Sequence, residues 1–103
     1  GVLVPLNDSD TLLDIIMPTY HVVVVVKHYL GSINHSLLTI KWLLLKGYDV
    51  AILFNGEPNK ASEDIITKIT GVPVLGRIGQ EATLTKEVVK KYAEQLRPAL
   101  MAW

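Results

Sequence analysis

One turn of the chain has the residue types and spacing to bind an anion. The five valines Val22 to Val26 lead into Lys27-His28-Tyr29-Leu30-Gly31-Ser32-Ile33-Asn34-His35, and a helical apolar pattern follows. A β-branched run bounded by a glycine turn is typical of a buried strand. A helix that opens beside the end of that strand directs unpaired backbone N–H groups at whatever lies there. We therefore expect the turn Leu30 to Asn34 to face an anion, although an ordinary turn capped by Ser32 or Asn34 stays open as the simpler interpretation.

The histidines and the first acidic residues predict no metal site. The candidates are His21, His28, His35, Asp8, Asp10 and Asp14. The histidine spacing does not bring the three rings to one metal ion, so each is expected at the surface or at a cap. The acids could mimic a magnesium pocket, but solvated acids at a helix cap and first turn are commoner. Asn55-Gly56 by itself is typical of a turn.

Strand-like and helix-like segments alternate along the chain. The strand-like segments are Val2 to Leu6, His21 to Lys27, Val50 to Asn55 and Val74 to Ile78. The helix-like segments are Asp10 to Met17, Ile33 to Lys46, Ser62 to Thr70 and Thr85 to Leu96. The alternation predicts an α/β fold with a parallel sheet and flanking helices. Because the valine strand is apolar throughout, its pattern suits burial on both faces in the middle of a wider sheet, and we expect the four strands of this chain alone to leave an edge exposed.

Local signals predict how the helices end and which sides they bury. Ser9 or Asp10 is expected to cap the first helix and Ser62 the third. Trp42 is expected to pack within the long helix. On the last helix the residues expected inward are Val88, Val89, Tyr92, Ala93 and Leu96, with a Glu87 and Lys91 pair outward.

The composition fits one domain over residues 1–103. Ten basic and ten acidic residues cancel, so the chain lacks the basic surface that nucleic acid requires as a partner. The absence of cysteine excludes disulfides and zinc-thiolate sites and is compatible with a cytoplasmic protein. The longest apolar stretch is far shorter than the roughly 20 residues that span a bilayer.

Four segments stand in an order and spacing that match a known family. They are Leu30-Gly31-Ser32-Ile33-Asn34-His35-Ser36-Leu37-Leu38-Thr39, Ile52-Leu53-Phe54-Asn55-Gly56, Val72-Pro73-Val74-Leu75-Gly76-Arg77-Ile78 and Gly1-Val2-Leu3-Val4-Pro5-Leu6. Together they resemble dethiobiotin synthetase, the ATP-dependent enzyme that closes the ureido ring in biotin synthesis. The resemblance implies a P-loop NTPase-like fold and an enzyme that uses ATP, Mg2+, CO2 and 7,8-diaminononanoate as a homodimer.

The resemblance also implies roles for particular residues. It assigns the carboxylate tail of the neighbouring subunit's diaminononanoate to the backbone of Leu30, Gly31, Ser32, Ile33 and Asn34. It assigns ATP, on the adenine side, to Asn55, Gly56, Gly79, Gln80, Glu81 and Lys86. Gly56 stands where relatives often have Asp, and Gly79 where they usually have Pro. No catalytic residue is expected in this chain.

The family's phosphate-binding loop is missing from the sequence. The chain contains no G-x-x-x-x-G-K-[ST] motif and begins at Gly1. We therefore interpret it as the C-terminal half of the enzyme and expect the chain alone to be inactive. Two alternatives remain: a non-enzymatic nucleotide-binding or regulatory module with the same fold, and a receiver-like domain. The receiver needs an Asp at a strand end, and none of the later strands ends in Asp.

Overall fold

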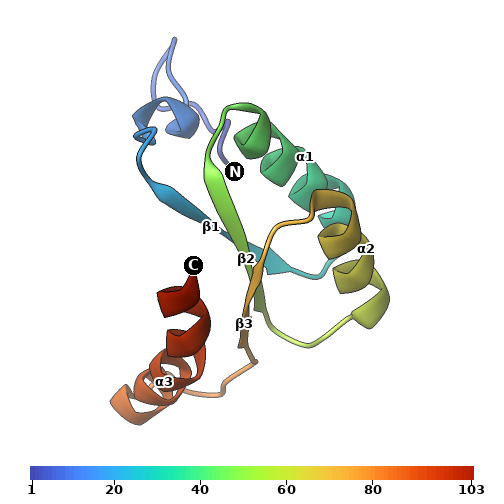
Figure 1. Cartoon of the computed structure of the whole chain (residues 1–103), viewed down its shortest axis with the longest axis vertical. Helices are drawn as coiled ribbons and strands as arrows, with labels where there is room; N and C mark the ends of the chain where they lie inside the picture. Colours follow the sequence, from blue (N-terminus) through green and yellow to red (C-terminus); the bar gives the residue numbers. More distant parts are fainter.

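The computed structural model describes all residues from Gly1 to Trp103 and shows a parallel sheet with helices on both sides (Figure 1). The strands β1 (His21–Lys27), β2 (Asp49–Asn55) and β3 (Val74–Ile78) are hydrogen-bonded in the order β1-β2-β3. The helices are α1 (Ser32–Leu45), α2 (Lys60–Thr70) and α3 (Lys86–Ala102). The predicted α/β class and parallel sheet are confirmed.

The first predicted strand, Val2 to Leu6, is wrong. This segment forms only an isolated antiparallel bridge between Pro5 and Thr11. Proline has no N–H to donate to a ladder, and the carbonyls of Val2 and Val4 accept from the N–H groups of Leu13 and Leu12 at 2.8 and 2.9 Å. The segment therefore folds back on the residues that follow it.

The first predicted helix, Asp10 to Met17, is shorter and capped differently. Only the 3-10 turn η1 (Leu12–Ile15) forms. Its cap is Thr11 rather than Ser9 or Asp10, because the Asp14 carboxylate accepts from the Thr11 N–H at 2.6 Å and from its hydroxyl at 3.0 Å. These two hydrogen bonds lower the pKa of Asp14, the one from the backbone N–H having the larger effect.

The core lies on the face of the sheet that α1 and α2 cover (Figure 1). Alternate residues of a strand point to opposite faces. The buried residues of this core are Val26, Ile40, Leu43, Val50, Ile52, Phe54 and Ile66. Helix α3 lies on the opposite side of the sheet and contacts β3 (Figure 1).

Within these 103 residues the valine strand β1 is buried on one face only. Val26 is 2% exposed, whereas Val25, on the other face, is 59% exposed. The strand is also an edge of the sheet, because it pairs with β2 alone. A largely apolar groove of about 810 Å³ runs along β1 and α1. Trp42 lines this groove and remains 37% exposed, rather than being enclosed in the core.

Helix α3 extends beyond its predicted end at Leu96, through Pro98, to Ala102. Its half-buried residues are Val88, Tyr92, Leu96 and Ala99, and Trp103 just beyond its end is also half-buried. Val89 and Ala93 are exposed, so the predicted inward face is wrong at these two positions. Lys91 pairs with Glu81 at 3.0 Å and not with Glu87. The helix therefore packs along a narrower stripe than its apolar pattern suggested.

Candidate functional site

Three turns meet at the carboxyl edge of the sheet. In parallel sheets the strands end at the same edge, where ligands commonly bind. Lys27 is the register partner of Asn55, and Asn55 is the partner of Ile78. Apart from Lys86, which begins α3, the residues to which the sequence assigned ligand contacts lie in the turns after β1, β2 and β3, at the last position of β2 or in the first turn of α1. The fold therefore brings the predicted site residues to one edge, although their binding roles remain predictions.

The turn after β1 offers fewer free N–H groups than its five predicted residues suggest. Gly31 caps α1 in the left-handed region, with φ at +96°, and neither Ser32 nor Asn34 serves as the cap. Ser32 is buried, and its N–H donates to the Tyr29 carbonyl at 3.0 Å. The His35 N–H donates to the Gly31 carbonyl at 3.0 Å. Of the five predicted residues, Leu30, Gly31, Ile33 and Asn34 thus keep N–H groups that no protein group accepts, and those of Ile33 and Asn34 lie in the first turn of the helix.

The need for glycine at position 31 comes from its backbone conformation. A Cβ built on Gly31 would lie 3.6 Å from the His35 ring, which is ordinary van der Waals contact. The positive φ is what disfavours other residues. Beside this turn, the side chain of Leu30 is fully exposed, and the Tyr29 hydroxyl bonds to Nδ1 of His35 at 2.8 Å.

The turn after β2 presents an unused amide. Asn55 is half-buried at the last position of β2, and its side chain makes no hydrogen bond with the protein. It lies on the same face of β2 as Ala51 and Leu53, the face toward α3. Gly56 follows with φ at +93°, and its N–H donates to the Ile78 carbonyl at 2.8 Å. An amide in this position can offer one donor and one acceptor to a ligand.

The turn after β3 is held by α3 instead of being free for a ligand. The Gly79 N–H donates to the Tyr92 hydroxyl at 3.1 Å, and that hydroxyl donates to the Glu81 carboxylate at 2.5 Å. The Tyr92 hydroxyl and the Lys91 ammonium together lower the pKa of Glu81. Gln80 and Lys86 are exposed and make no hydrogen bond through their side chains. Of the predicted contacts after β3, these two are the available ones.

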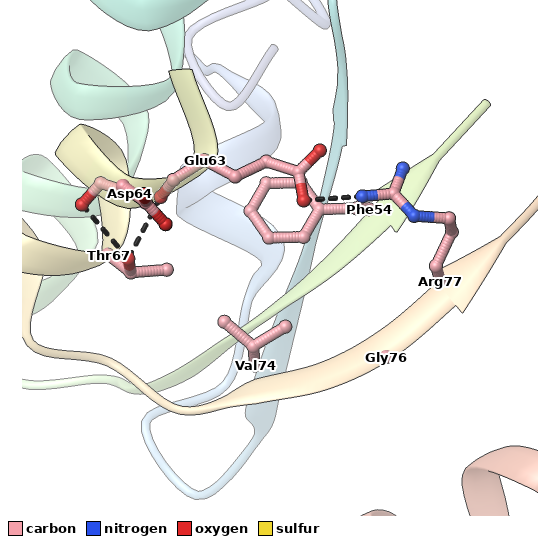
Figure 2. A pocket seen from close by; sticks show the side chains of 7 residues that line it. All are labelled: Phe54, Glu63, Asp64, Thr67, Val74, Gly76 and Arg77. Atoms are coloured by element: carbon pink, nitrogen blue, oxygen red, sulfur yellow. Dashed lines mark hydrogen bonds and ion pairs between the residues drawn. The ribbon is translucent and has the colours of Figure 1, made fainter. Parts of the chain in front are cut away.

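Sequence reasoning missed a half-buried polar cluster beside this edge, formed by His28, Glu63 and Arg77. Nε2 of His28 bonds to the Glu63 carboxylate at 2.7 Å, and Arg77 pairs with the other oxygen of Glu63 (Figure 2). Burial raises the pKa of Glu63, but hydrogen bonds from the Asn59 N–H, Arg77 and His28 outweigh that effect and lower it overall. His28 therefore is not the surface or capping residue that we expected.

A capping pattern could have indicated part of this cluster. The cap of α2 is Asn59 rather than Ser62: the Asn59 side chain accepts from the Ser62 N–H at 3.1 Å. The Asn59 N–H in turn donates to the Glu63 carboxylate at 2.9 Å. An acid shortly after an N-cap residue is a known signature of a helix start. Nothing local in the sequence indicated His28 or Arg77.

A small hollow lies next to the cluster, between α2 and β3. It has a volume of about 330 Å³, and Figure 2 shows the side chains that line it. No three His, Asp or Glu side chains gather in an arrangement that could hold a metal ion. None of the helices has both the length and the apolar character to cross a membrane.

Comparisons with known proteins agree with this architecture. The family model described as an AAA domain matches residues 1–88, so the chain belongs to that family and has a P-loop NTPase-like fold. Three curated relatives carry the name "ATP-dependent dethiobiotin synthetase BioD". That of Christiangramia forsetii is 43% identical and covers 97% of this chain and 49% of the relative. That of Cytophaga hutchinsonii is 49% identical and covers 93% and 48%. That of Lawsonia intracellularis is 39% identical and covers 87% and 45%.

The chain spans about half the length of the curated relatives it matches. The similarity to proteins named dethiobiotin synthetase confirms the resemblance seen in the four motifs. The comparisons do not support the expectation that this is the C-terminal half. No solved structure gives a significant match to the chain.

Proposed function

We propose that this chain serves the ATP-dependent synthesis of dethiobiotin. In this reaction 7,8-diaminononanoate is carboxylated with CO2, and a ureido ring is then closed between its two amines. The observation that carries the proposal is the Asn55 side chain, which is half-buried at the carboxyl edge and has no partner within the protein. An amide that no protein group satisfies is free to bond to a ligand. A base edge with a neighbouring donor and acceptor matches what the amide offers.

Asn55 is proposed to bind the adenine of ATP, and the backbone at Gly56 to lie against the same base. The Gly79 N–H and the Glu81 carboxylate are already bonded to Tyr92, so Gln80 and Lys86 are the better candidates after β3. The residues here do not converge on Mg2+. Phosphate and Mg2+ contacts are therefore assigned to sequence outside these 103 residues, which contain no Gly-Lys-Ser or Gly-Lys-Thr.

The start of α1 is proposed to bind the carboxylate tail of diaminononanoate in the neighbouring subunit of a homodimer. The available donors are the N–H groups of Leu30, Gly31, Ile33 and Asn34, because only that of Ser32 is used locally. The exposed side chains of Tyr29 and Leu30 stand beside them. Exposed apolar groups around a polar centre are typical of a protein contact surface, which supports a subunit interface here.

The groove along β1 is the proposed place for the remaining half of the domain. The outer edge of β1 has unpaired backbone groups, and the groove beside it is mainly apolar. The relatives are about twice as long as this chain. An added parallel strand would pair with β1 and cover Val25. The sheet would then bury its valine strand as the sequence pattern requires.

A chimera tests the proposal. This chain would replace the matching segment of the Cytophaga hutchinsonii relative, with which it is 49% identical. We expect diaminononanoate-dependent release of ADP and formation of dethiobiotin. A folded chimera that binds ATP by calorimetry without turnover would favour the non-enzymatic module instead. The unmodified relative is the positive control.

A further inference from the structure

Residues 55–59 run from the last position of β2 through the turn to the cap of α2. Hydrogen bonds from one polar cluster hold this turn at both ends. The guanidinium of Arg77 donates to the Gly56 carbonyl at 2.9 Å. The Glu63 carboxylate accepts from the Asn59 N–H at 2.9 Å. Because Arg77 and Glu63 also pair with each other, the two ends of the turn are joined through their side chains.

The cluster is rigid because each of its groups is held more than once. Both oxygens of Glu63 have partners, one of them shared by His28 and the Asn59 N–H. The Phe54 ring lies between two of the charged or polar groups: the His28 ring stacks on it at 5.7 Å, and the Arg77 guanidinium is 5.6 Å from its centre. The side chains of His28, Glu63 and Arg77 are only 12, 16 and 26% exposed. Figure 2 shows Glu63 and Arg77 extended toward each other beside Phe54.

The ring nitrogen with which His28 donates follows from its partner. A carboxylate can only accept, so Nε2 of His28 carries the proton that it shares with Glu63. Its Nδ1 is buried without a partner. The cluster thus joins the opposite charges of Arg77 and Glu63, with the His28 ring as a further donor to Glu63.

An apolar cluster of similar volume would stabilise the fold as well or better, because burying an ion pair costs desolvation energy. What the polar groups add is the set of hydrogen bonds to the backbone of the turn. We infer that Arg77 and Glu63 are positioning residues that fix residues 55–59 and so orient Asn55 for the nucleotide. This inference rests on the proposed function, and His28 supports it by anchoring Glu63 to the end of β1.

The first experiment measures ATP and diaminononanoate kinetics in the chimera. Arg77→Met should raise the KM for ATP about fivefold or more, as expected for loss of a half-buried charged hydrogen bond. The KM for diaminononanoate should change less than about twofold. Arg77→Lys should raise the KM for ATP by an intermediate amount. A lysine keeps the charge but lacks the two separate N–H groups with which Arg77 binds Glu63 and the Gly56 carbonyl. Lys60→Met is the matched control, since Lys60 belongs to an exposed pair with Asp64 on α2.

The second experiment is a double-mutant cycle between Arg77 and Asn55. If Arg77 acts through Asn55, then Arg77→Met combined with Asn55→Ala should raise the KM for ATP little more than Asn55→Ala alone. Effects that multiply would overturn the positioning role, since a merely structural residue acts independently. Should Asn55→Ala alone leave the KM for ATP unchanged, the nucleotide assignment itself would fail, which separates the two hypotheses.

The third experiment needs no catalysis. Amide hydrogen exchange in the full chain should become faster at Gly56 and Asn59 in Arg77→Met and Glu63→Gln. Exchange in the middle of β2 should stay as in the unmodified chain, and Asp64→Asn should leave the turn protected. Unchanged exchange at Gly56 and Asn59 in both variants would show that the cluster does not hold the turn.

Discussion

Gly76 of β3 and Leu96 of α3 are in direct contact, and the contact leaves no room for a side chain at position 76. A Cβ there would lie 2.6 Å from Cδ2 of Leu96, and φ at Gly76 is +147°. The position falls just after the register shift between β2 and β3. Glycine at this place therefore lets α3 approach the sheet.

Gly76→Ala should destabilise the chain by about 1 to 3 kcal/mol, because it adds both backbone strain and a clash. Urea unfolding followed by circular dichroism measures the loss. Gly47→Ala is the control: φ is +88° there, but nothing lies within 4 Å, so it reports backbone strain alone. Equal losses at the two positions would mean that the contact with Leu96 adds nothing.

Asn55→Ala in the chimera should raise the KM for ATP more than that for diaminononanoate. Loss of one hydrogen bond to a buried base edge costs about 1 to 3 kcal/mol, or roughly 5- to 150-fold. Steady-state kinetics with each substrate varied in turn will show the split. Gln95→Ala, which removes an exposed amide on α3, should change neither KM. An unchanged KM for ATP in Asn55→Ala would leave Asn55 as a turn residue only.

Stability should fall as the pH drops below the ordinary pKa of 4.5 for Glu63. The folded state holds this pKa below that value, so the unfolded state binds more protons at acidic pH. The stabilisation is therefore complete above about pH 4.5 and is lost as the pH falls through the folded pKa. Urea midpoints between pH 7 and 3 measure it. Glu63→Gln should flatten the curve and Asp64→Asn much less; the slope cannot vanish, because the pKa values of Asp14 and Glu81 are lowered too.

The sequence predicted β1, α2 and β3 closely because each carries its own local signal. Consecutive valines mark β1, and glycines in the left-handed region close α1 and α2. The failures arise where long-range packing decides. Val2 to Leu6 looked like a strand, but Pro5 and the adjacent η1 turn it into a loop. The exposure of Val25 agrees with the sequence pattern, since the pattern of β1 suits a wider sheet than these residues form.

Part of the candidate site could also be predicted from local features of the sequence, and part could not. The turns at Gly31 and Asn55 could be predicted because a glycine or an asparagine near the end of a strand is a local feature. The cluster of His28, Glu63 and Arg77 joins positions up to 49 residues apart in the printed sequence, and no periodicity connects them. The Tyr92 hydroxyl, which uses the Gly79 N–H, is equally invisible before α3 is placed on the sheet.

The 103-residue chain alone should show no ligase activity, because it lacks a phosphate-binding loop and a cluster of metal ligands. It should also associate through the open edge of β1 and the apolar groove. Light scattering and an assay for diaminononanoate-dependent release of ADP test both points. Turnover above the blank would contradict the division of roles proposed here, and a monodisperse monomer with a sharp thermal transition would show that the groove needs no partner.

The cross-subunit role of the α1 start predicts complementation between two inactive chimeras. Gly31→Glu places a carboxylate beside the Ile33 and Asn34 N–H groups, so it should repel the substrate tail and weaken diaminononanoate binding far more than ATP binding. Gly31→Ala brings similar backbone strain without the charge and costs about 1 kcal/mol of stability. It should leave substrate affinity nearly unchanged.

The partner in this complementation is a chimera whose own phosphate-binding loop is disabled. In a mixed dimer, the site with the sound loop receives its α1 start from the loop variant, whose Gly31 is intact. The other site combines both defects. Activity should therefore return on mixing, to at most half of the dimers' sites, whereas each variant alone stays inactive. Subunit exchange is verified by native mass spectrometry. If exchanged dimers remain inactive, the residues Leu30 to Asn34 serve their own subunit or no substrate at all.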